Sequence, residues 1–316
     1  MNYLKKLSHR SLKTFYDLIR IMLPVMILVR IGEEFELSRS LGLILGPVME
    51  LVGLPPEAGL VWAVTMLTGL YGGVGAYLGL ISDLNMSVGQ HSVLCAMMLF
   101  AHSIPVEQAI VRRAGASFFL TTGLRILAAL VYGAGVAWIC SATDSLSQPL
   151  EPTWLTSGLT VGLASPDWFA WAAATGMTLL TMFGIIIFLF ILLDGLETAG
   201  FIKWITRVMA PALSALGIDP RLAPLVTVGM VLGLTYGGGL IIDATRETQY
   251  SKRALFLALG FLSISHAIIE DTAVMLALGA DIRVILFGKL AFTLGLIVVL
   301  AFILENFERR RTRARP

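Results

Sequence analysis

Two histidines lie inside long apolar segments of the chain, and each is followed within five residues by an acidic residue. His102 precedes Glu107, and His266 precedes Glu270 and Asp271. An ionisable side chain costs about 2.5 kcal/mol or more at the centre of a membrane-spanning helix, so these residues need a reason to be there. Imidazole and carboxylate groups together can bind a divalent metal ion or share a proton. These residues are therefore the first candidates for a binding site.

The spacing of these residues leaves their geometry partly open. His266 and Glu270 are four residues apart, so a continuous helix would place them on one face, where they suit a divalent metal or a shared proton. Pro105 separates His102 from Glu107, so spacing does not assign their relation. In a structural alternative, each histidine bonds a carbonyl freed by a break in its own helix, and the acids cap half-helices. The tentative metal set is His102, His266, Glu270 and Asp271.

Two basic residues form a second pair within apolar segments. Arg125 and Lys289 each lie far enough from the ends of their segments to be awkward in lipid. One interpretation makes them counter-ions of the acidic residues Glu107, Asp271 or Glu270, which describes a buried charge network. The alternative is that they present positive charge to an anionic substrate.

Two Tyr-Gly-Gly triplets supply a different kind of chemistry. Glycine lets the backbone approach a ligand closely, and the ends of half-helices offer unpaired amides or carbonyls. Ser103, beside the first histidine, would add a hydroxyl contact. The triplets are Tyr71, Gly72 and Gly73 in the first half, and Tyr236, Gly237 and Gly238 in the second. We predict that the triplets and the histidine segments together form the substrate site.

Composition makes the membrane the natural solvent of the chain. Its 316 residues have a mean hydropathy of +0.83, and 57% of them are hydrophobic while only 14% are charged. This balance is too apolar for a soluble domain with a solvated surface. Apolar segments of roughly 20 residues are long enough for a helix to cross a bilayer. The predicted spans include Phe15 to Ile31, Ser117 to Cys140, Trp168 to Leu193 and Val284 to Leu304.

The sequence repeats itself at a separation of 164 residues. Because unrelated residue types agree on one separation, the match indicates an internal repeat. The Tyr-Gly-Gly triplets match with one extra residue between them. The equivalent pairs are Pro47 and Pro211, Gly53 and Gly217, Pro56 and Pro220, His102 and His266, and Arg125 and Lys289.

Equivalent loops of the two copies carry opposite charge signatures. Ser82 to His91 contains no Lys or Arg, whereas its counterpart Asp243 to Arg253 contains Arg246, Lys252 and Arg253. By the positive-inside rule, the copies insert in opposite orientations, which requires an odd number of crossings in each.

We therefore predict an all-α integral membrane protein of two inverted-topology repeats, each with about three spans, an interfacial helix and a re-entrant hairpin. The hairpins would turn at the Tyr-Gly-Gly tips. The alternative is that the glycine-rich segments are ordinary tilted spans with helix-packing glycines. The predicted hairpins are Gly59 to Ser82 and Leu222 to Ile242, and the predicted interfacial helices are Leu41 to Leu54 and Trp204 to Leu216.

Charge at the two ends and in the middle of the chain sets the predicted domains. Residues 1–20 and the tail after Leu304 are basic, so both termini are expected in the cytoplasm, in a bacterial inner membrane. The predicted domains are a first repeat in residues 1–140, an external linker in 141–167 without Lys or Arg, and a second repeat in 168–316. The expected partners are the lipid bilayer, a small solute or ion, and further copies of the chain, without nucleic acid.

This arrangement resembles the Gate, or nucleoside-recognition, membrane domain. That domain occurs in stand-alone bacterial proteins, spore maturation proteins, concentrative nucleoside transporters and, in related form, the ferrous iron transporter. The resemblance covers about Pro24 to Leu304. It rests on the order of interfacial helix, glycine-rich hairpin and broken helix, and on the segments Thr235 to Gly239 and Ser265 to Thr272.

The resemblance implies that substrate binds between two hairpin tips and two broken helices that move as an elevator. The contact regions would be Tyr71 to Gly75, Tyr236 to Gly239, His102 to Pro105 and His266 to Asp271. Both tips here are Tyr-Gly-Gly, which departs from the Gln-Thr-Glu-like polar tip of the nucleoside transporters and counts against a nucleoside. The chain also has no Walker A motif, so the resemblance does not extend to the whole ferrous iron transporter.

The predicted function is a secondary transporter with alternating access for a small polar or charged solute, without enzymatic activity. No cofactor is assigned, and the candidate ions are a divalent metal, a coupling proton or Na⁺. Imidazole with carboxylate suits zinc, iron or manganese better than calcium. The alternatives are nucleoside or nucleobase transport, and a non-transporting scaffold or regulator of the spore-maturation type.

Overall fold

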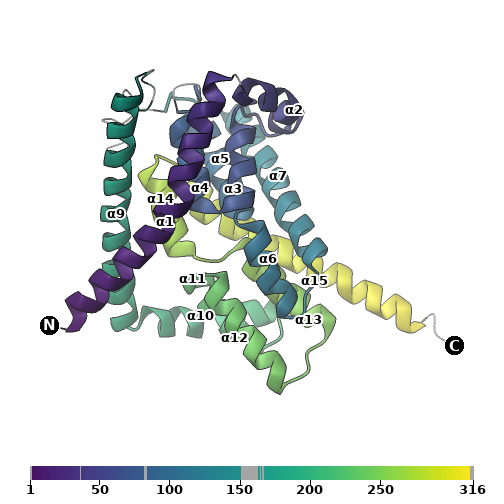
Figure 1. The fold of residues 1–316 in the computed structure, drawn as a ribbon. Helices are drawn as coiled ribbons and strands as arrows, with labels where there is room; N and C mark the ends of the chain where they lie inside the picture. The colour runs from purple at the N-terminus through teal and green to yellow at the C-terminus, as the bar shows by residue number, and fades with distance from the viewer. Residues whose placement is uncertain are drawn as a thin grey trace. The chain divides into compact units, whose positions relative to one another are not determined.

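The computed structural model describes residues 2–35, 37–81, 84–150, 163, 165 and 167–313 (Figure 1). Every extended regular element in these residues is a helix, and one isolated bridge joins Ser87 to Pro149. The prediction of an all-α membrane protein is confirmed. Residues 151–162, which form much of the predicted external linker, lie outside the described residues.

The helices of the first half recur in the second half at the separation of 164 residues. Three pairs of helices both begin and end 164 residues apart, namely α2 with α10, α5 with α13, and α6 with α14. The first half contains α1 (Asn2–Glu34), α2 (Leu37–Leu51), α3 (Ala58–Thr68), α4 (Leu70–Gly79), α5 (Val88–Phe100), α6 (Ile104–Arg113) and α7 (Phe118–Thr143). The second contains α9 (Trp168–Thr198), α10 (Phe201–Ala215), α11 (Ala223–Leu232), α12 (Leu234–Glu247), α13 (Lys252–Ile264), α14 (Ile268–Ala277), the π-helix η1 (Arg283–Gly288) and α15 (Lys289–Arg313).

Five helical stretches among the described residues are long and apolar enough to cross a membrane. α1 is 33 residues long, but Asp17, Arg20 and Arg30 interrupt its apolar part, and it is not one of the five. The span predicted within α1 therefore stays a prediction. The five are Val88–Arg113, Phe118–Thr143, Trp168–Thr198, Lys252–Ala277 and Arg283–Phe307.

Two pairs of short helices form hairpins, but they turn earlier than the sequence predicted. α3 and α4 meet at Gly69 with φ +106°, and α11 and α12 meet at Gly233 with φ +99°. Glycine readily accepts such a positive φ, unlike other residues. The Tyr-Gly-Gly triplets lie inside α4 and α12, so the prediction that the hairpins turn there is wrong. The two turn glycines, Gly69 and Gly233, are 164 residues apart, like the other equivalent pairs. The match of the two copies therefore needs no extra residue at the hairpins. Thr235, rather than Tyr236, is therefore the counterpart of Tyr71.

The glycines of the triplets let the two arms of each hairpin pack closely. A Cβ atom at Gly73 would lie 1.8 Å from the Thr65 hydroxyl of the facing helix α3. At Gly237 it would lie 2.4 Å from the Cα atom of Gly229 on α11. No side chain fits at such distances, so these glycines are required by hairpin packing.

Serine caps start the helices that carry the histidine segments. The Ser87 hydroxyl accepts a hydrogen bond from the backbone N–H of Gln90, whose side chain bonds back to Ser87 in a capping box. The Ser251 hydroxyl accepts from the N–H of Ala254 in the same position of the second half. These caps fix where α5 and α13 begin.

Each histidine segment breaks its helix. Ser103 and Ala267 adopt positive φ values of 49° and 47° in the gaps that follow α5 and α13. Such values are uncommon outside glycine and mark strained positions. His266 lies in the gap, so the prediction that it shares a helix face with Glu270 is wrong, because that relation needs a continuous helix.

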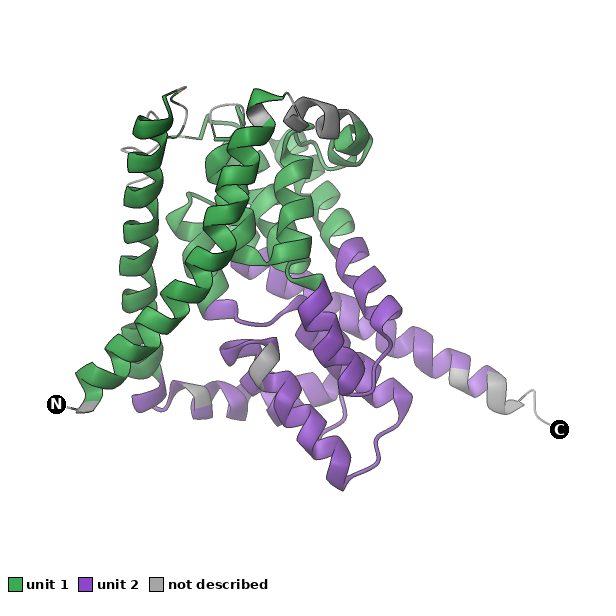
Figure 2. Ribbon diagram, in the orientation of Figure 1, with its two compact units in different colours: residues 1–104, 129–196, 270–285 green, residues 105–128, 197–269, 286–316 purple. Residues whose placement is uncertain are grey.

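The chain divides into two compact units that differ from the two halves of the sequence (Figure 2). Unit 1 comprises residues 1–104, 129–196 and 270–285, and unit 2 comprises residues 105–128, 197–269 and 286–316. α14 therefore belongs to the unit built mainly from the first repeat, and nearly all of α6 belongs to the other. Each unit combines a histidine from one repeat with acidic residues from the other repeat.

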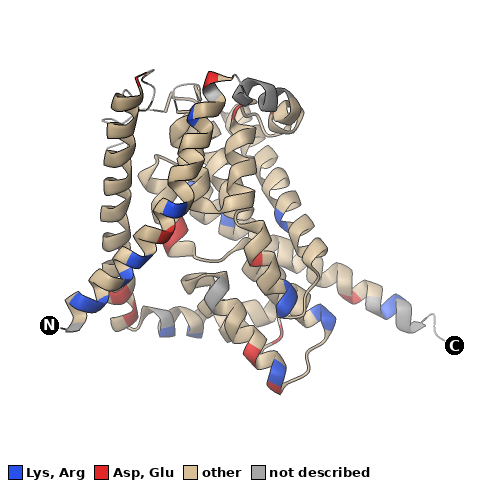
Figure 3. Ribbon diagram, in the orientation of Figure 1, with Lys and Arg blue, Asp and Glu red and all other residues tan. Residues whose placement is uncertain are grey.

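Basic residues lie near the start of α1 and near the end of α15 (Figure 3). The first turns of α1 carry Lys5, Lys6, Arg10 and Lys13, and the last turns of α15 carry Arg309 and Arg310. In unit 2, buried apolar side chains of the hairpin α11–α12 form one core with those of α10, α13 and α15. This core includes Phe261, Leu262, Met230 and Ile297, all of them buried.

Candidate functional site

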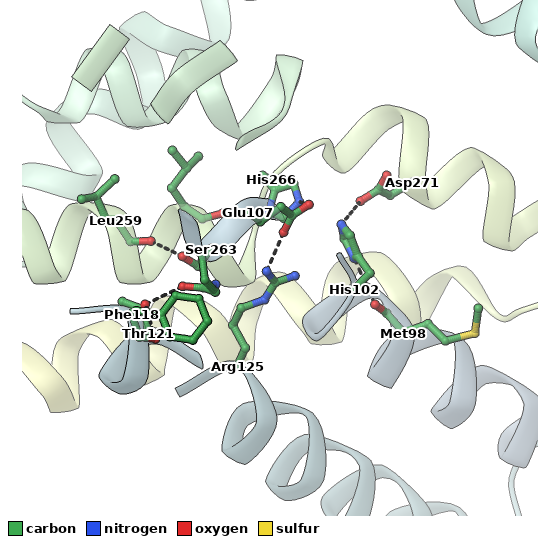
Figure 4. Close-up of polar contacts among 12 residues, drawn as sticks. Met98, His102, Glu107, Phe118, Thr121, Arg125, Leu259, Ser263, His266 and Asp271 are labelled. Carbon is green, nitrogen blue, oxygen red and sulfur yellow. Dashed lines mark hydrogen bonds and ion pairs between the residues drawn. The ribbon is translucent and has the colours of Figure 1, made fainter. Parts of the chain in front are cut away.

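In unit 1, the first histidine joins a helix break to a carboxylate of the other repeat. His102 Nδ1 lies 3.0 Å from the carbonyl oxygen of Met98, one turn back in α5 (Figure 4). His102 Nε2 lies 4.0 Å from Asp271 Oδ2 in the first turn of α14. Both residues are buried, with exposed fractions of 5% and 7%. The histidine therefore caps its own helix and also faces an acidic group.

The hairpin turn of unit 1 lies against the same break. The backbone N–H of Ser103 donates to the Thr65 carbonyl of α3 at 3.0 Å, and a Cβ atom at Gly69 would lie 3.4 Å from the Ser103 hydroxyl oxygen. The hydroxyl of Tyr71 donates to Glu270 Oε1 at 2.9 Å, so α4 is joined to α14. The predicted residues of this unit are therefore assembled around one break.

Unit 2 has the same backbone arrangement with a tighter charge cluster. His266 Nδ1 lies 3.0 Å from the Leu262 carbonyl oxygen, and His266 Nε2 lies 3.2 Å from Glu107 Oε1. The other carboxylate oxygen, Oε2, accepts a hydrogen bond from Arg125 Nη1 at 2.5 Å (Figure 4). Arg125 is fully buried, and Glu107 is only 9% exposed. This is a buried ion pair extended by an imidazole.

The carbonyl contact of His266 has a consequence for its proton. A carbonyl oxygen only accepts hydrogen bonds, so Nδ1 must carry the hydrogen. The contact between Nε2 and Glu107 then needs one further proton, held either by the imidazole or by the carboxyl group. The His266–Glu107 contact is therefore a hydrogen bond in which one of the two groups carries the proton.

The remaining predicted residues are placed as follows. Lys289 is buried in unit 2 at the start of α15, directly after the π-helix. Gly233, at the second hairpin turn, faces Ala267 of the second break, as Gly69 faces Ser103 in unit 1. The side chain of Tyr236 lies outside the described residues. The tentative metal set divides between the units: His102, Glu270 and Asp271 belong to unit 1 and His266 to unit 2.

Further buried polar groups accompany the second break, and sequence reasoning missed them. Gln108, Thr121, Ser263 and Ser265 are at most 1% exposed, and all belong to unit 2. The Thr121 hydroxyl donates to Gln108 Oε1 at 2.5 Å, and the Ser263 hydroxyl donates to the Leu259 carbonyl at 2.6 Å. A residue-by-residue comparison of the two copies would have found Ser263 and Ser265, because the first copy has Leu99 and Ala101 there.

Among the described residues, a short loop of each unit contains an aspartate outside the spans that pairs with the arginine two residues later. Hydrogen bonds from Arg221 hold the pKa of Asp219 below its ordinary value, against a smaller opposing effect of burial. Arg283 lowers the pKa of Asp281 in the same way. These exposed pairs belong to loop structure rather than to the candidate site.

Residues 179–281 match the family model described as Gate, nucleoside recognition. A curated relative, the uncharacterized membrane protein YvoD of Bacillus subtilis (strain 168), is 26% identical to this chain over 301 residues. The match covers 94% of this chain and 93% of the relative. No solved structure matches the chain. The chain is therefore similar along almost its whole length to a membrane protein, and its residues 179–281 are similar to the Gate, or nucleoside-recognition, family.

Proposed function

We propose that the protein is a secondary transporter that moves a small polar or charged solute across the membrane by alternating access. The observation that carries the proposal is the burial of a histidine–carboxylate pair at each of two helix breaks. Ionisable groups and irregular backbone at membrane depth are tolerated where they line a solute or ion pathway. Paired broken helices are the best pointer to a transport site.

The geometry of unit 2 favours proton coupling over transport of a divalent metal ion. Glu107 already accepts a hydrogen bond from the Arg125 guanidinium, and a positive charge at that distance opposes a second cation on the same carboxylate. The Nε2 atom of His266 is engaged with Glu107 rather than free to ligate. A shared proton fits this arrangement without further ligands, so we assign the pair to proton binding.

A nucleoside is the second candidate for the solute, and the family match favours it. The matched residues 179–281 include the second hairpin and the second histidine break. The Tyr-Gly-Gly sequence beside that hairpin turn supplies backbone groups and a phenol but no carboxamide or carboxylate. We therefore keep a nucleoside as one arm of the test rather than as the conclusion.

The proposal is tested with the purified protein in proteoliposomes. Uptake of uridine, citrate and Mn²⁺ is measured with and without an imposed pH gradient. We expect one of these probes to accumulate against its gradient when the pH gradient is present, and His102→Ala and His266→Ala to abolish this accumulation. His9→Ala is the matched control, because His9 is exposed on α1. Accumulation that survives both break variants contradicts the proposed role of the pairs.

We also propose that the protein resides in a bacterial inner membrane with both termini in the cytoplasm. The basic ends of α1 and α15 support this orientation through the positive-inside rule. A Ser8→Cys variant tests it, because Ser8 is exposed in α1 and the native cysteines are buried or half-buried. Labelling of intact cells by a membrane-impermeant maleimide at that position would contradict the orientation.

A further inference from the structure

Two polar groups beside the histidine–carboxylate pair of unit 2 have no hydrogen-bond partner among the described residues. They are the amide nitrogen Nε2 of Gln108 and the hydroxyl oxygen of Ser265. Gln108 follows Glu107 in α6, and Ser265 precedes His266 in the break. Gln108 is fully buried and Ser265 is 1% exposed, so neither polar group forms a hydrogen bond with bulk water.

Such groups are unfavourable for folding and require an explanation. A buried donor or acceptor without a partner costs about 1–3 kcal/mol, and native proteins keep few of them. Comparable atoms occur on Ser11 of α1 and Thr175 of α9, which are remote in sequence from both breaks. Gln108 and Ser265 are distinguished because both adjoin, in sequence, the two members of one pair 3.2 Å apart.

The other copy of the repeat shows that the backbone needs neither polar group. The counterpart of Ser265 is Ala101, which ends α5 with φ −136° and ψ 72°, close to the φ −146° and ψ 62° of Ser265. The counterpart of Gln108 is Thr272, which has no amide group. The break therefore forms without the Ser265 hydroxyl, and the matching position of α14 needs no amide group, so the backbone arrangement does not account for these two polar atoms.

We propose that Gln108 and Ser265 are specificity-determining residues that hydrogen-bond the transported solute in unit 2. This inference rests on the proposed transport function and names the class of solute. The Gln108 amide nitrogen can only donate, so the solute must present an acceptor oxygen or nitrogen there. The Ser265 hydroxyl can donate or accept. The site therefore selects a solute with carbonyl, hydroxyl or carboxylate oxygens rather than a bare metal cation.

The position of the charges agrees with this class of solute. Glu107, Arg125 and His266 already satisfy one another, so the cluster offers no uncompensated carboxylate to a cation. The carboxamide oxygen of Gln108 is held by the Thr121 hydroxyl, which orients the amide group and leaves its nitrogen available. Binding of the solute would remove the cost of the two buried groups, and this provides specificity against solutes that lack a matching acceptor.

The test compares apolar substitutions at the two positions, first without any solute. Gln108→Met keeps the length of the side chain, and the Thr121 hydroxyl can donate its hydrogen to the Ser117 carbonyl, 2.8 Å away, in place of Gln108. Ser265→Ala reproduces the residue found in the other copy. Because each change removes a polar atom that lacks a partner, we expect the thermal unfolding temperature of the solute-free protein to stay equal or rise. A clear fall for both variants would overturn the proposal.

The second arm measures stabilisation by uridine, citrate and Mn²⁺ added to the purified protein. A solute that binds only the folded protein raises its unfolding temperature. We expect uridine or citrate to stabilise the wild type, and each substitution to remove most of that rise. The matched control is Ser263→Ala, because that hydroxyl already donates to its own helix. It should leave the rise unchanged.

The outcomes separate this proposal from the transport function itself. A rise that persists in both variants, or one produced by Mn²⁺ alone, would overturn the assignment of Gln108 and Ser265 even if transport is found. Failure of every probe to accumulate in proteoliposomes would contradict the transport function. In that case the solute-free comparison still decides whether the two groups lack partners in the folded protein.

Discussion

The two helix breaks share a backbone but differ in chemistry. In each, a histidine Nδ1 lies 3.0 Å from a carbonyl one turn earlier, and a residue with φ near 50° follows. In unit 1 the histidine is 4.0 Å from its carboxylate, and a tyrosine bonds a second acidic residue. In unit 2 the histidine bonds a carboxylate that a buried arginine also holds.

This difference separates the features that both copies share from those that occur in one copy. The positive-φ residues, the serine caps and the hairpin turns are duplicated, so they form the scaffold. Tyr71 and Glu270 have no equivalents, because Thr235 and Val106 stand at the matching positions. Gln108 and Ser265 likewise occur only once. A symmetric scaffold therefore carries two unequal sites, one with an additional carboxylate and one with additional neutral polar groups.

The largest effect is expected from removing the buried arginine of unit 2. Arg125→Leu leaves Glu107 buried without its guanidinium partner, and loss of one member of a buried pair costs about 3–5 kcal/mol. The unfolding temperature of the purified protein in lipid nanodiscs measures the loss. We expect a large fall, and most variant molecules should fail to stay folded in the membrane.

A double variant controls for simple loss of packing. Arg125→Leu combined with Glu107→Leu removes both charges, and replacing a buried pair by apolar groups is often neutral or stabilising. It should recover much of the lost stability. If the double variant were as unstable as Arg125→Leu, the pair would not be the reason for the effect, and the electrostatic contrast between the breaks would fail.

The next effect concerns the hydrogen bond between Tyr71 and Glu270 in unit 1. Tyr71→Phe removes the donor to Glu270 but keeps the ring, and leaving a part-buried acceptor without its donor costs about 1–3 kcal/mol. A double-mutant cycle with Glu270→Gln, read from unfolding temperatures, isolates the coupling. Additive effects of the two substitutions would show that the bond does not join α4 to α14.

Somewhat smaller losses of stability are expected from alanine substitutions in the two hairpins. Alanine at Gly237 would meet backbone at 2.4 Å, whereas alanine at Gly73 would meet the Thr65 side chain. Backbone moves less readily than a side chain, so we expect Gly237→Ala to cost about 1–3 kcal/mol and Gly73→Ala to cost less. Unfolding temperature again provides the measurement.

A matched control lies on the same helix as Gly237. A Cβ atom at Gly239 would meet nothing within 4 Å, and alanine favours a helix over glycine by about 1 kcal/mol. Gly239→Ala should therefore be neutral or stabilising. If all three alanine variants behaved alike, close packing of the hairpin arms would not explain the glycines.

Sequence reasoning predicted the helical class, the hairpins and the broken helices because these depend on local patterns. Apolar length indicates spans, and glycine or proline within an apolar segment indicates interruption. It placed the hairpin turns at the wrong glycines, since a sequence contains many glycines and only backbone geometry shows which have positive φ. Gly69 and Gly233 do, whereas the triplet glycines are helical.

The partners of the histidines could not be derived from spacing. His266 contacts Glu107, 159 residues away, rather than Glu270 four residues away. Proximity along the chain was misleading because the helix break separates the two neighbours, and α6 of the other repeat supplies the carboxylate instead. Arg125 was considered as a counter-ion from its burial in an apolar segment, and the structure places it on Glu107. Which acidic residue it contacts depends on the fold.

The smallest effect is expected at two short loops, one in each unit, in which an aspartate pairs with the arginine two residues later. Asp219 of unit 2 and Asp281 of unit 1 have pKa values below the ordinary 3.8, because hydrogen bonds from Arg221 and Arg283 favour the carboxylate. A lowered pKa stabilises the fold above the ordinary value, and this stability is lost as pH falls through the folded value. Asp219→Asn and Asp281→Asn should therefore flatten the loss of unfolding temperature below about pH 4.

The effect of each substitution on the unfolding temperature should be slight, because the arginines are exposed. Since each loop belongs to one unit, the variant that flattens the curve more identifies the unit whose loop limits stability in acid, and unchanged curves in both would show that neither pair contributes.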